Sequence, residues 1–348
     1  MWYKIFVYFC HVINFEQTKN KLLNNKNMKR FVLILVSAML ITPIFAVTKN
    51  TYTFAEKDGQ ELKLDVYMPE DSLKEHPCMI FAFGGGFKMG ARDEASYQNF
   101  LTEMAENGVV GMSIDYRLGL AGVEEKSLIK LANYMVNAIT MAVEDMASAV
   151  KFAIDNAEQF KINPNQIIIS GSSAGAITAL QTQYYQCNSD DVVSVLPKDF
   201  KFAGVVSFAG AVMSFGGKLK YKTQPAPVLF MHGTEDGMVQ YNKLEIFNRG
   251  MYGPKYLISK IWEKNKWPYM ALRFKNFGHE VAMIGFKENV PAVLEFINEF
   301  VLNPSKIYMK DITIAERGVE SPLLVLDSDK LYGGEKVEIS PEVMERIK

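Results

Sequence analysis

The chain has 348 residues, and its hydrophobic fraction of 49% and charged fraction of 22% are those of a globular protein. A formal net charge of −1 argues against a general nucleic-acid-binding protein, which would carry a basic excess. Three cysteines are too few for a disulfide scaffold, and no Cys/His cluster has the spacing of a zinc site, so we expect no metal and no cofactor. Cys78 and Cys187 are predicted to be buried free thiols, with a disulfide between them as the alternative.

Residues 28–46 have the pattern of a secretory signal peptide. A basic start, Met28-Lys29-Arg30, is followed by an apolar run over residues 31–41 and then by the small residue Ala46. The apolar run is short for a membrane span, which needs about 20 residues. We therefore expect cleavage near Ala46, export to the periplasm or the extracellular space, and a mature chain without a stable membrane span. An N-terminal membrane anchor is the alternative.

Short apolar segments alternate with segments of helical periodicity along the rest of the chain. Residues 51–54 and 62–67 alternate apolar and polar side chains around Asp58-Gly59, which predicts a β-hairpin at the edge of a sheet. The other expected strands cover residues 78–83, 109–115, 167–169, 205–208, 228–231 and 269–274, and the expected helices cover residues 95–107, 142–152, 176–180, 255–265 and 290–301.

This alternation predicts an α/β fold, in which a mainly parallel sheet carries helices on both faces. We expect one such domain over residues 47–303. Ligands bind such a sheet at the carboxyl ends of its strands. After Pro304 the sequence becomes charged, with two short apolar pieces. Residues 304–348 are therefore expected to form a tail that packs on the domain or extends from it.

One expected strand, at 167–169, leads into Gly171-Ser172-Ser173-Ala174-Gly175 and then into an expected helix. A Gly-x-Ser-x-Gly motif between a strand and a helix is typical of a nucleophilic serine. The glycines leave space for a sharp turn that exposes one side chain. The N-terminus of the helix offers N–H groups and the positive end of its dipole to a nearby oxyanion. Ser173 is therefore the candidate nucleophile.

A serine hydroxyl needs a base to take its proton, and histidine is the usual base because its pKa lies near neutrality. The chain has four histidines, all but one in the expected mature part. His76 should lie at the amino end of its strand, away from Ser173. His232 directly follows a strand, and we expect it to shape the turn before Asp236. His279 stands in a short loop after the last expected strand, so it is the candidate base.

The base in turn needs a carboxylate that fixes its tautomer and stabilises its charged form. Asp236 follows the strand that precedes the strand of His279, and it stands in the order Ser…Asp…His that is expected on such a sheet. Glu235 and Glu280 are the alternatives. We expect Asp236 to be the carboxylate.

A glycine run, Gly84-Gly85-Gly86, follows the expected strand at 78–83. Without a Cβ, its backbone can turn N–H groups towards a substrate. Gly85, Gly86 and the amide of Ala174 are candidate donors to an oxyanion, each worth roughly 3 kcal/mol. A tight turn is the alternative role, and a phosphate-binding loop is not favoured because no Lys-Ser/Thr pair follows.

With these motifs, the chain resembles α/β-hydrolases of the carboxylesterase and hormone-sensitive-lipase-like esterase group over about residues 50–302. The matching motifs are Gly84-Gly85-Gly86-Phe87, Asp115-Tyr116-Arg117-Leu118, Gly171-Ser172-Ser173-Ala174-Gly175, His232-Gly233-Thr234-Glu235-Asp236 and Gly278-His279-Glu280. The resemblance implies the α/β-hydrolase fold. It also implies the following roles: nucleophile Ser173, acid Asp236, base His279, and oxyanion donors Gly85, Gly86 and Ala174.

The chain departs from the family pattern at one motif. The family usually has a histidine before the three glycines, and this chain has Phe83. The donors are backbone groups, so the oxyanion hole can survive this change.

The expected reaction is transfer of an acyl group from a small-molecule or saccharide ester to water through an acyl-enzyme on Ser173. Because the sequence has no long, strongly apolar lid, we expect short acyl or aryl esters rather than long-chain lipids. By analogy with exported esterases of this type, acetyl or feruloyl groups of polysaccharides are candidate substrates. A serine peptidase of the prolyl-oligopeptidase type is one alternative, although such enzymes usually carry a large extra domain. A non-catalytic binding module on the same fold is the other.

Residues 1–27 do not fit in front of a signal peptide, so we expect translation to start at Met28. The protein from its native source should then begin at about Val47, without Met1 and without the signal segment. Intact-mass measurement or N-terminal sequencing of the native protein checks this expectation. A native chain that retains Met1 would contradict it.

Overall fold

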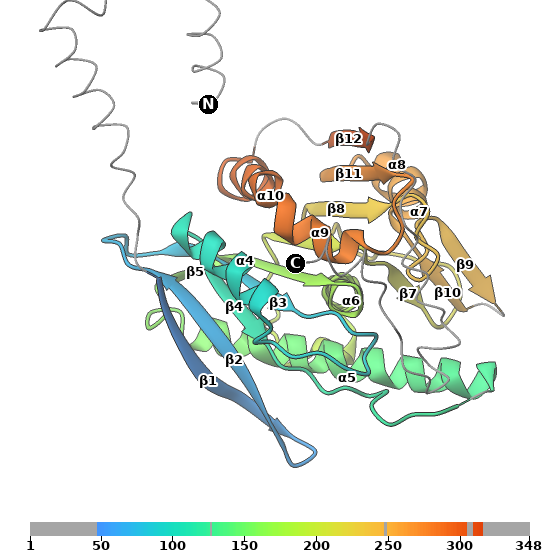
Figure 1. The fold of residues 1–348 in the computed structure, drawn as a ribbon, viewed down its shortest axis with the longest axis horizontal. Helices are drawn as coiled ribbons and strands as arrows, with labels where there is room; N and C mark the ends of the chain where they lie inside the picture. Colours follow the sequence, from blue (N-terminus) through green and yellow to red (C-terminus); the bar gives the residue numbers. More distant parts are fainter. Residues whose placement is uncertain (1–46, 126, 247–248, 305–308, 316–348) are drawn as a thin grey trace, which may run out of the picture. The chain divides into compact units, whose positions relative to one another are not determined.

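The computed structural model describes residues 47–125, 127–246, 249–304 and 309–315 (Figure 1). The predicted leading segment at 1–27, the predicted signal peptide at 28–46 and most of the predicted tail lie outside the described residues.

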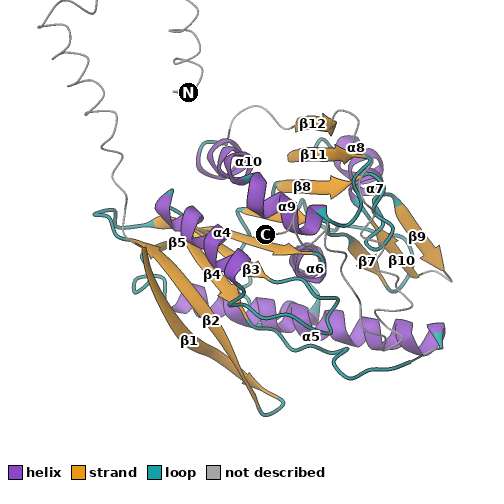
Figure 2. Ribbon diagram, viewed as in Figure 1, coloured by secondary structure: helices purple, strands orange, loops and turns teal. Residues whose placement is uncertain are grey.

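A nine-stranded sheet forms the centre of the described chain (Figure 2). In spatial order its strands are β1 (Val47–Lys57), β2 (Gln60–Pro69), β4 (Val110–Ile114), β3 (His76–Ala82), β5 (Ile162–Ser172), β6 (Gly204–Phe208), β8 (Val228–Gly233), β11 (Tyr269–Lys275) and β12 (Met309–Ala315). β1 and β2 form an antiparallel hairpin at one edge, and β2 pairs antiparallel with β4. All further neighbours pair in parallel. The predicted mainly parallel sheet and its edge hairpin are confirmed.

Helices cover both faces of this sheet (Figure 1). The helices are α4 (Ala95–Glu106), α5 (Leu128–Asp155), α6 (Ala174–Asn188), α7 (Pro254–Leu257), α8 (Glu263–Asn265), α9 (Val281–Glu288) and α10 (Val290–Phe296), together with a short 3₁₀ turn (Asp191–Val193) and the π-helical segments Ile258–Trp262 and Ile297–Leu302. α4, α9 and α10 contact one another, and α5 and α6 contact each other on the opposite face. In the described part of the chain, no helix combines the length and the apolar character that crossing a membrane requires.

An aromatic cluster joins one helical layer to the sheet. Phe81 on β3 contacts Tyr97 and Phe100 on α4 and Phe286 on α9, with ring centroids 5.1 to 6.0 Å apart. Phe208 on β6 contacts Phe81, Phe100 and Phe286 at 5.8 to 6.5 Å. All five side chains are buried, and burial of each phenylalanine contributes roughly 1.5–3 kcal/mol. The cluster therefore fixes α4 and α9, the two helices that follow the predicted glycine loop and the predicted base.

The two cysteines in the described residues, Cys78 and Cys187, are buried free thiols, as predicted. Burial raises the pKa of Cys187 to about 11. The thiol therefore stays protonated and unreactive at neutral pH.

A second, small sheet was not predicted. β7 (Val212–Ser214), β10 (Arg249–Tyr252) and β9 (Lys243–Ile246) pair antiparallel in that order. These strands have three or four residues each, which is too short for a period-two pattern to be recognised in the sequence.

β12 extends the main sheet beyond the predicted end of the domain. Residues 309–315, which the sequence analysis assigns to the tail, pair in parallel with β11. The guanidinium of Arg273 on β11 donates two hydrogen bonds to the carboxylate of Asp311, at 2.7 and 2.6 Å. The predicted boundary at residue 303 therefore falls within the part of the chain that forms the sheet.

The contact between α6 and β3 can be tested at Gly175. A Cβ on Gly175 would lie 2.0 Å from the carbonyl oxygen of Ala82, so Gly175→Ala should lower the free energy of unfolding by about 1–3 kcal/mol or more through overpacking. Urea unfolding of the two proteins measures the difference. Gly216→Ala is the matched control, because a Cβ there would meet nothing within 4 Å and should change stability by less than about 0.5 kcal/mol. Equal stability of the two variants would contradict the packing argument.

Candidate active site

Ser173 lies in the turn between β5 and α6 and is half-buried. Its φ of 51° and ψ of −114° lie outside the regions that L-residues ordinarily adopt. The turn is held from both sides, because the Ser173 N–H donates to the Phe208 carbonyl and the Ser173 carbonyl accepts from the Ile177 N–H, both at 2.9 Å. A strained serine between a strand and a helix has its hydroxyl exposed above the sheet edge, as a nucleophile requires.

The structure brings Ser173, His279 and Asp236 together at the carboxyl ends of β5, β11 and β8. Nε2 of His279 lies 2.8 Å from Oγ of Ser173, and Nδ1 of His279 lies 2.8 Å from Oδ2 of Asp236. The serine hydroxyl can therefore donate to Nε2 while Nδ1–H donates to the carboxylate. His279 and Asp236 are 7% and 4% exposed, so little water competes for these bonds. This geometry is the one that a nucleophile, its base and an orienting carboxylate require.

The Asp236 carboxylate is held in its ionised form. Burial alone would raise its pKa, but hydrogen bonds from His232 and His279 outweigh burial and hold the pKa well below its usual range. Its second oxygen, Oδ1, accepts from the N–H groups of Met238 at 3.0 Å and Val239 at 2.9 Å. Asp236 can therefore supply a fixed negative charge opposite the reacting face of the imidazole.

His232 supports this carboxylate. Its Nε2 lies 2.8 Å from the carbonyl oxygen of Val239 and 3.2 Å from Oδ2 of Asp236, and the side chain is buried. His232 therefore spans the turn that carries Asp236, in agreement with the structural role expected for it.

His76 lies at the amino end of β3, as predicted. It contacts the carbonyl of Gly108 and the carboxylate of Asp71, both at 3.1 Å.

The loop of Asp236 and the loop of His279 are joined by hydrogen bonds. The Glu235 N–H donates to the Phe277 carbonyl at 2.9 Å, and the Asn276 N–H donates to Oγ1 of Thr234 at 2.9 Å. A Cβ on Gly233 would lie 2.3 Å from the carbonyl oxygen of Phe277, so only glycine permits this approach. The distance between the carboxylate and the imidazole is therefore set by contacts between the two loops.

The glycine loop follows β3 and lies against Ser173. A Cβ on Gly84 would be 3.4 Å from Cβ of Ser173. Gly85 and Gly86 have φ values of 128° and 63°, which favour glycine, and the Gly85 carbonyl accepts two N–H groups of the same loop at 3.1 Å. Ala174 is the first residue of α6. All three predicted oxyanion donors thus belong to segments that adjoin Ser173.

The chain is similar in sequence to esterases. The BD-FAE family model matches residues 64–215. The chain is 30% identical to gut esterase 1 of Caenorhabditis elegans over 129 residues, and this aligned region covers 37% of this chain and 22% of that protein. It is 29% identical to para-nitrobenzyl esterase of Bacillus subtilis (strain 168) over 130 residues, a region that covers 37% of this chain and 25% of that protein. The chain spans only 22% to 33% of the length of the first such relatives.

The fold is that of a solved esterase. The structure of Thermogutta terrifontis esterase 2 phosphoramylated by tabun matches with a TM-score of 0.53 and 19% identity, over 74% of this chain and 97% of that chain. This likeness shows the α/β-hydrolase fold. The sequence matches, each to a part of the chain, support an α/β-hydrolase esterase group.

The two carboxylates weighed as alternatives to Asp236 make contacts with other groups. Glu235 is exposed and lies 3.4 Å from Oγ1 of Thr234, and Oε1 of Glu280 accepts from the Gly278 N–H at 2.9 Å. Asp236 is the carboxylate on His279.

Ser172, for which no role is predicted, connects the turn of Ser173 to the helix that follows His279. Its hydroxyl donates to the Ala282 carbonyl at 2.6 Å, at the start of α9. Ser172 occupies a variable position of the Gly-x-Ser-x-Gly motif, and α9 is only eight residues long, so neither gave a signal in the sequence.

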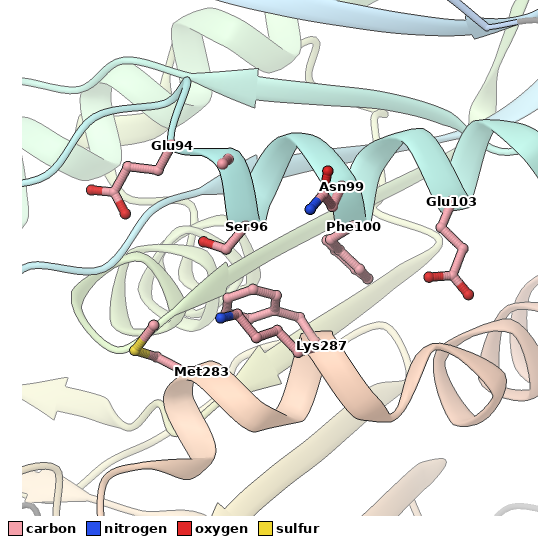
Figure 3. Close-up of a pocket in the computed structure, with 9 residues that line it drawn as sticks. Glu94, Ser96, Asn99, Phe100, Glu103, Met283 and Lys287 are labelled. Atoms are coloured by element: carbon pink, nitrogen blue, oxygen red, sulfur yellow. The ribbon is translucent and has the colours of Figure 1, made fainter. Parts of the chain in front are cut away.

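A cavity of about 590 Å³ lies between α4 and α9 (Figure 3). Its walls combine charged, polar and apolar side chains: Glu94, Ala95, Ser96, Asn99, Phe100, Glu103, Met283, Phe286 and Lys287. α4 follows the glycine loop and α9 begins two residues after His279. The cavity is therefore formed by the two helices that leave the candidate site.

The charge of Asp236 should appear in the pH dependence of stability. Because its folded-state pKa is lowered, ionised Asp236 stabilises the fold above about pH 4, the usual pKa of Asp, and this stabilisation is lost as the pH falls below that. Asp236→Asn should thus lower the free energy of unfolding by about 1–3 kcal/mol at pH 7. The deficit should shrink at pH 3, as measured by urea unfolding at both pH values.

Glu235→Gln is the control for Asp236→Asn. It removes the neighbouring carboxylate, which is exposed, and should change stability by less than about 0.5 kcal/mol at either pH. A deficit in Asp236→Asn that is equal at pH 7 and pH 3 would show that the charge of Asp236 does not stabilise the fold.

Proposed function

We propose that the protein is a serine esterase that hydrolyses carboxylic esters through an acyl-enzyme on Ser173. The proposal rests on the hydrogen-bonded chain from Ser173 through His279 to Asp236, with 2.8 Å at each step. A nucleophile, its base and an orienting carboxylate in this order can perform acyl transfer without a metal or a cofactor.

In the proposed mechanism, Oγ of Ser173 attacks the ester carbonyl while Nε2 of His279 takes the hydroxyl proton. The carbonyl oxygen becomes an oxyanion that accepts hydrogen bonds from the amides of Gly85, Gly86 and Ala174. The tetrahedral intermediate collapses as the imidazolium gives its proton to the departing alcohol, which leaves an acyl-enzyme. His279 then takes a proton from water, the hydroxide attacks the acyl carbonyl, and Ser173 leaves with that proton.

We propose short acyl or aryl esters as the substrates, with acetyl or feruloyl groups of saccharides among them. The absence of a long, strongly apolar lid segment from the sequence favours short acyl groups. Ser96, Asn99 and Glu94 in the cavity between α4 and α9 offer donors and acceptors that suit the hydroxyl groups of a saccharide alcohol. We also propose that the mature chain is exported after cleavage near Ala46.

Hydrolysis of p-nitrophenyl esters from acetate to palmitate tests the proposal. The wild-type protein should hydrolyse the short esters fastest. Ser173→Ala should lower kcat by about 10⁴-fold or more, because the nucleophile and its base act as a unit. A fluorophosphonate probe should label the wild-type protein and not Ser173→Ala.

Other outcomes would redirect the assignment. Cleavage of proline-containing peptides without ester hydrolysis would favour a serine peptidase of the prolyl-oligopeptidase type. A folded protein that neither hydrolyses esters or peptides nor reacts with the fluorophosphonate would favour a binding module. Ester hydrolysis that persists in Ser173→Ala would exclude Ser173 as the nucleophile.

A further inference from the structure

The peptide group between Phe83 and Gly84 is held from both sides by tyrosine hydroxyls. The hydroxyl of Tyr116 donates to the Phe83 carbonyl at 2.9 Å, and the Gly84 N–H donates to the hydroxyl oxygen of Tyr97 at 3.3 Å. The carbonyl of one residue and the N–H of the next belong to one planar unit. Two hydrogen bonds from different parts of the chain therefore fix the plane of the peptide at which β3 passes into the glycine loop.

Tyr116 is itself held rigidly. Its ring stacks on that of Phe83, with centroids 4.4 Å apart and planes inclined by 27°. The next residue, Arg117, donates its N–H to Asp145 at 2.8 Å, and its guanidinium donates to the same buried carboxylate at 2.9 to 3.1 Å. Phe83 thus replaces the usual histidine of the family pattern with a ring that packs against the tyrosine.

Tyr97 reaches the same peptide from α4. It is 5% exposed, and its ring contacts Phe81 and Phe286 at 5.1 and 5.3 Å. These contacts belong to the aromatic cluster between α4, α9 and the sheet. The position of its hydroxyl is therefore set by the packing of the core.

The clamped peptide adjoins the nucleophile. Gly84 is the residue whose Cβ would lie 3.4 Å from Cβ of Ser173 and 3.3 Å from the Ser172 carbonyl, and the proposed donors Gly85 and Gly86 follow it directly. A rotation of the 83–84 peptide would change the direction of the next amides in the chain.

We propose that Tyr97 and Tyr116 are positioning residues, which clamp the Phe83–Gly84 peptide and so aim the amides of the glycine loop at the oxyanion. This role rests on the proposed esterase function.

Both hydroxyls keep their protons over the working range of an esterase. Burial, followed by the charge of Glu94, raises the pKa of Tyr97 to about 12. Burial raises the pKa of Tyr116 well above its usual value. The Tyr116 hydroxyl therefore remains a donor to the Phe83 carbonyl at neutral and moderately alkaline pH.

Tyr97→Phe and Tyr116→Phe test the clamp, because each removes one hydroxyl and keeps the ring. Hydrogen–deuterium exchange of the full-length protein should become faster in the segment 83–90 in both variants, with no increase in β5 or α6. With p-nitrophenyl acetate, kcat should fall about tenfold and KM should change less than twofold. This loss is smaller than that for removal of an oxyanion donor itself, about 10²–10³. The affinity for a boronic acid, which forms a tetrahedral adduct on serine, should fall by the same factor as kcat.

Tyr67→Phe is the matched control. Tyr67 on β2 is a buried tyrosine whose hydroxyl has no hydrogen-bond partner within the described residues. Tyr67→Phe should leave the hydrogen–deuterium exchange of segment 83–90, the kcat and the affinity for the boronic acid unchanged.

The possible results test three statements separately: that the tyrosines hold the loop, that they position the oxyanion donors, and that the protein is an esterase. Unchanged exchange of segment 83–90 in both tyrosine variants would overturn the clamp. Faster exchange with unchanged kcat, in an active wild-type protein, would overturn the positioning role. If the wild-type protein hydrolyses no ester, the proposed function fails and the positioning role fails with it, while the exchange rates still decide whether the tyrosines hold the loop.

Discussion

Close packing of three backbones beneath Ser173 is the constraint on which the rest of the site depends. A Cβ on Gly171 would lie 2.3 Å from the carbonyl carbon of Gly175, and a Cβ on Gly175 would lie 2.0 Å from the carbonyl oxygen of Ala82. Strand β5, helix α6 and the end of β3 can meet only because no side chain stands between them. The same contact brings the glycine loop after β3 beside Ser173. The strained turn and the proposed oxyanion donors thus share one packing requirement.

A second requirement is that the Asp236 carboxylate stays ionised although it is buried. Two imidazoles and two backbone amides surround the carboxylate. The hydrogen bonds from the two imidazoles outweigh the effect of burial on its pKa. The groups that stabilise the carboxylate include several that are near to Asp236 in sequence and one that is distant. His232 and the two amides belong to the turn of Asp236 itself, so the ionised carboxylate is assembled locally. His279 comes from the neighbouring loop and supplies the contact at Oδ2 that is distant in sequence.

The sequence was sufficient for the features that local patterns encode. Buried strands such as β3 and β6 appear as largely apolar runs because helices cover both sheet faces. The positions of Ser173, Asp236 and His279, each after a predicted parallel strand, imply a common edge. Features that depend on tertiary contacts could not be predicted. The edge strand β12 is recognisable only by its pairing with β11, and the bond from Ser172 to Ala282 spans 110 residues. Nothing in the local sequence of Tyr97 indicates that its hydroxyl meets Gly84.

The phenylalanine before the glycine run shows how a change in a motif can be accommodated. The Phe83–Gly84 peptide group beside Ser173 is partly removed from bulk water, and leaving it without hydrogen bonds would cost about 1–3 kcal/mol. In this chain its carbonyl and N–H each meet a tyrosine hydroxyl, so no polar side chain is needed at position 83. The apolar ring can then pack on Tyr116, and the bond that fixes the peptide and the contact that fixes the tyrosine support each other. The loop requires that the peptide group before it has both of its hydrogen bonds and one fixed orientation. Two buried tyrosine hydroxyls meet this requirement while position 83 is phenylalanine.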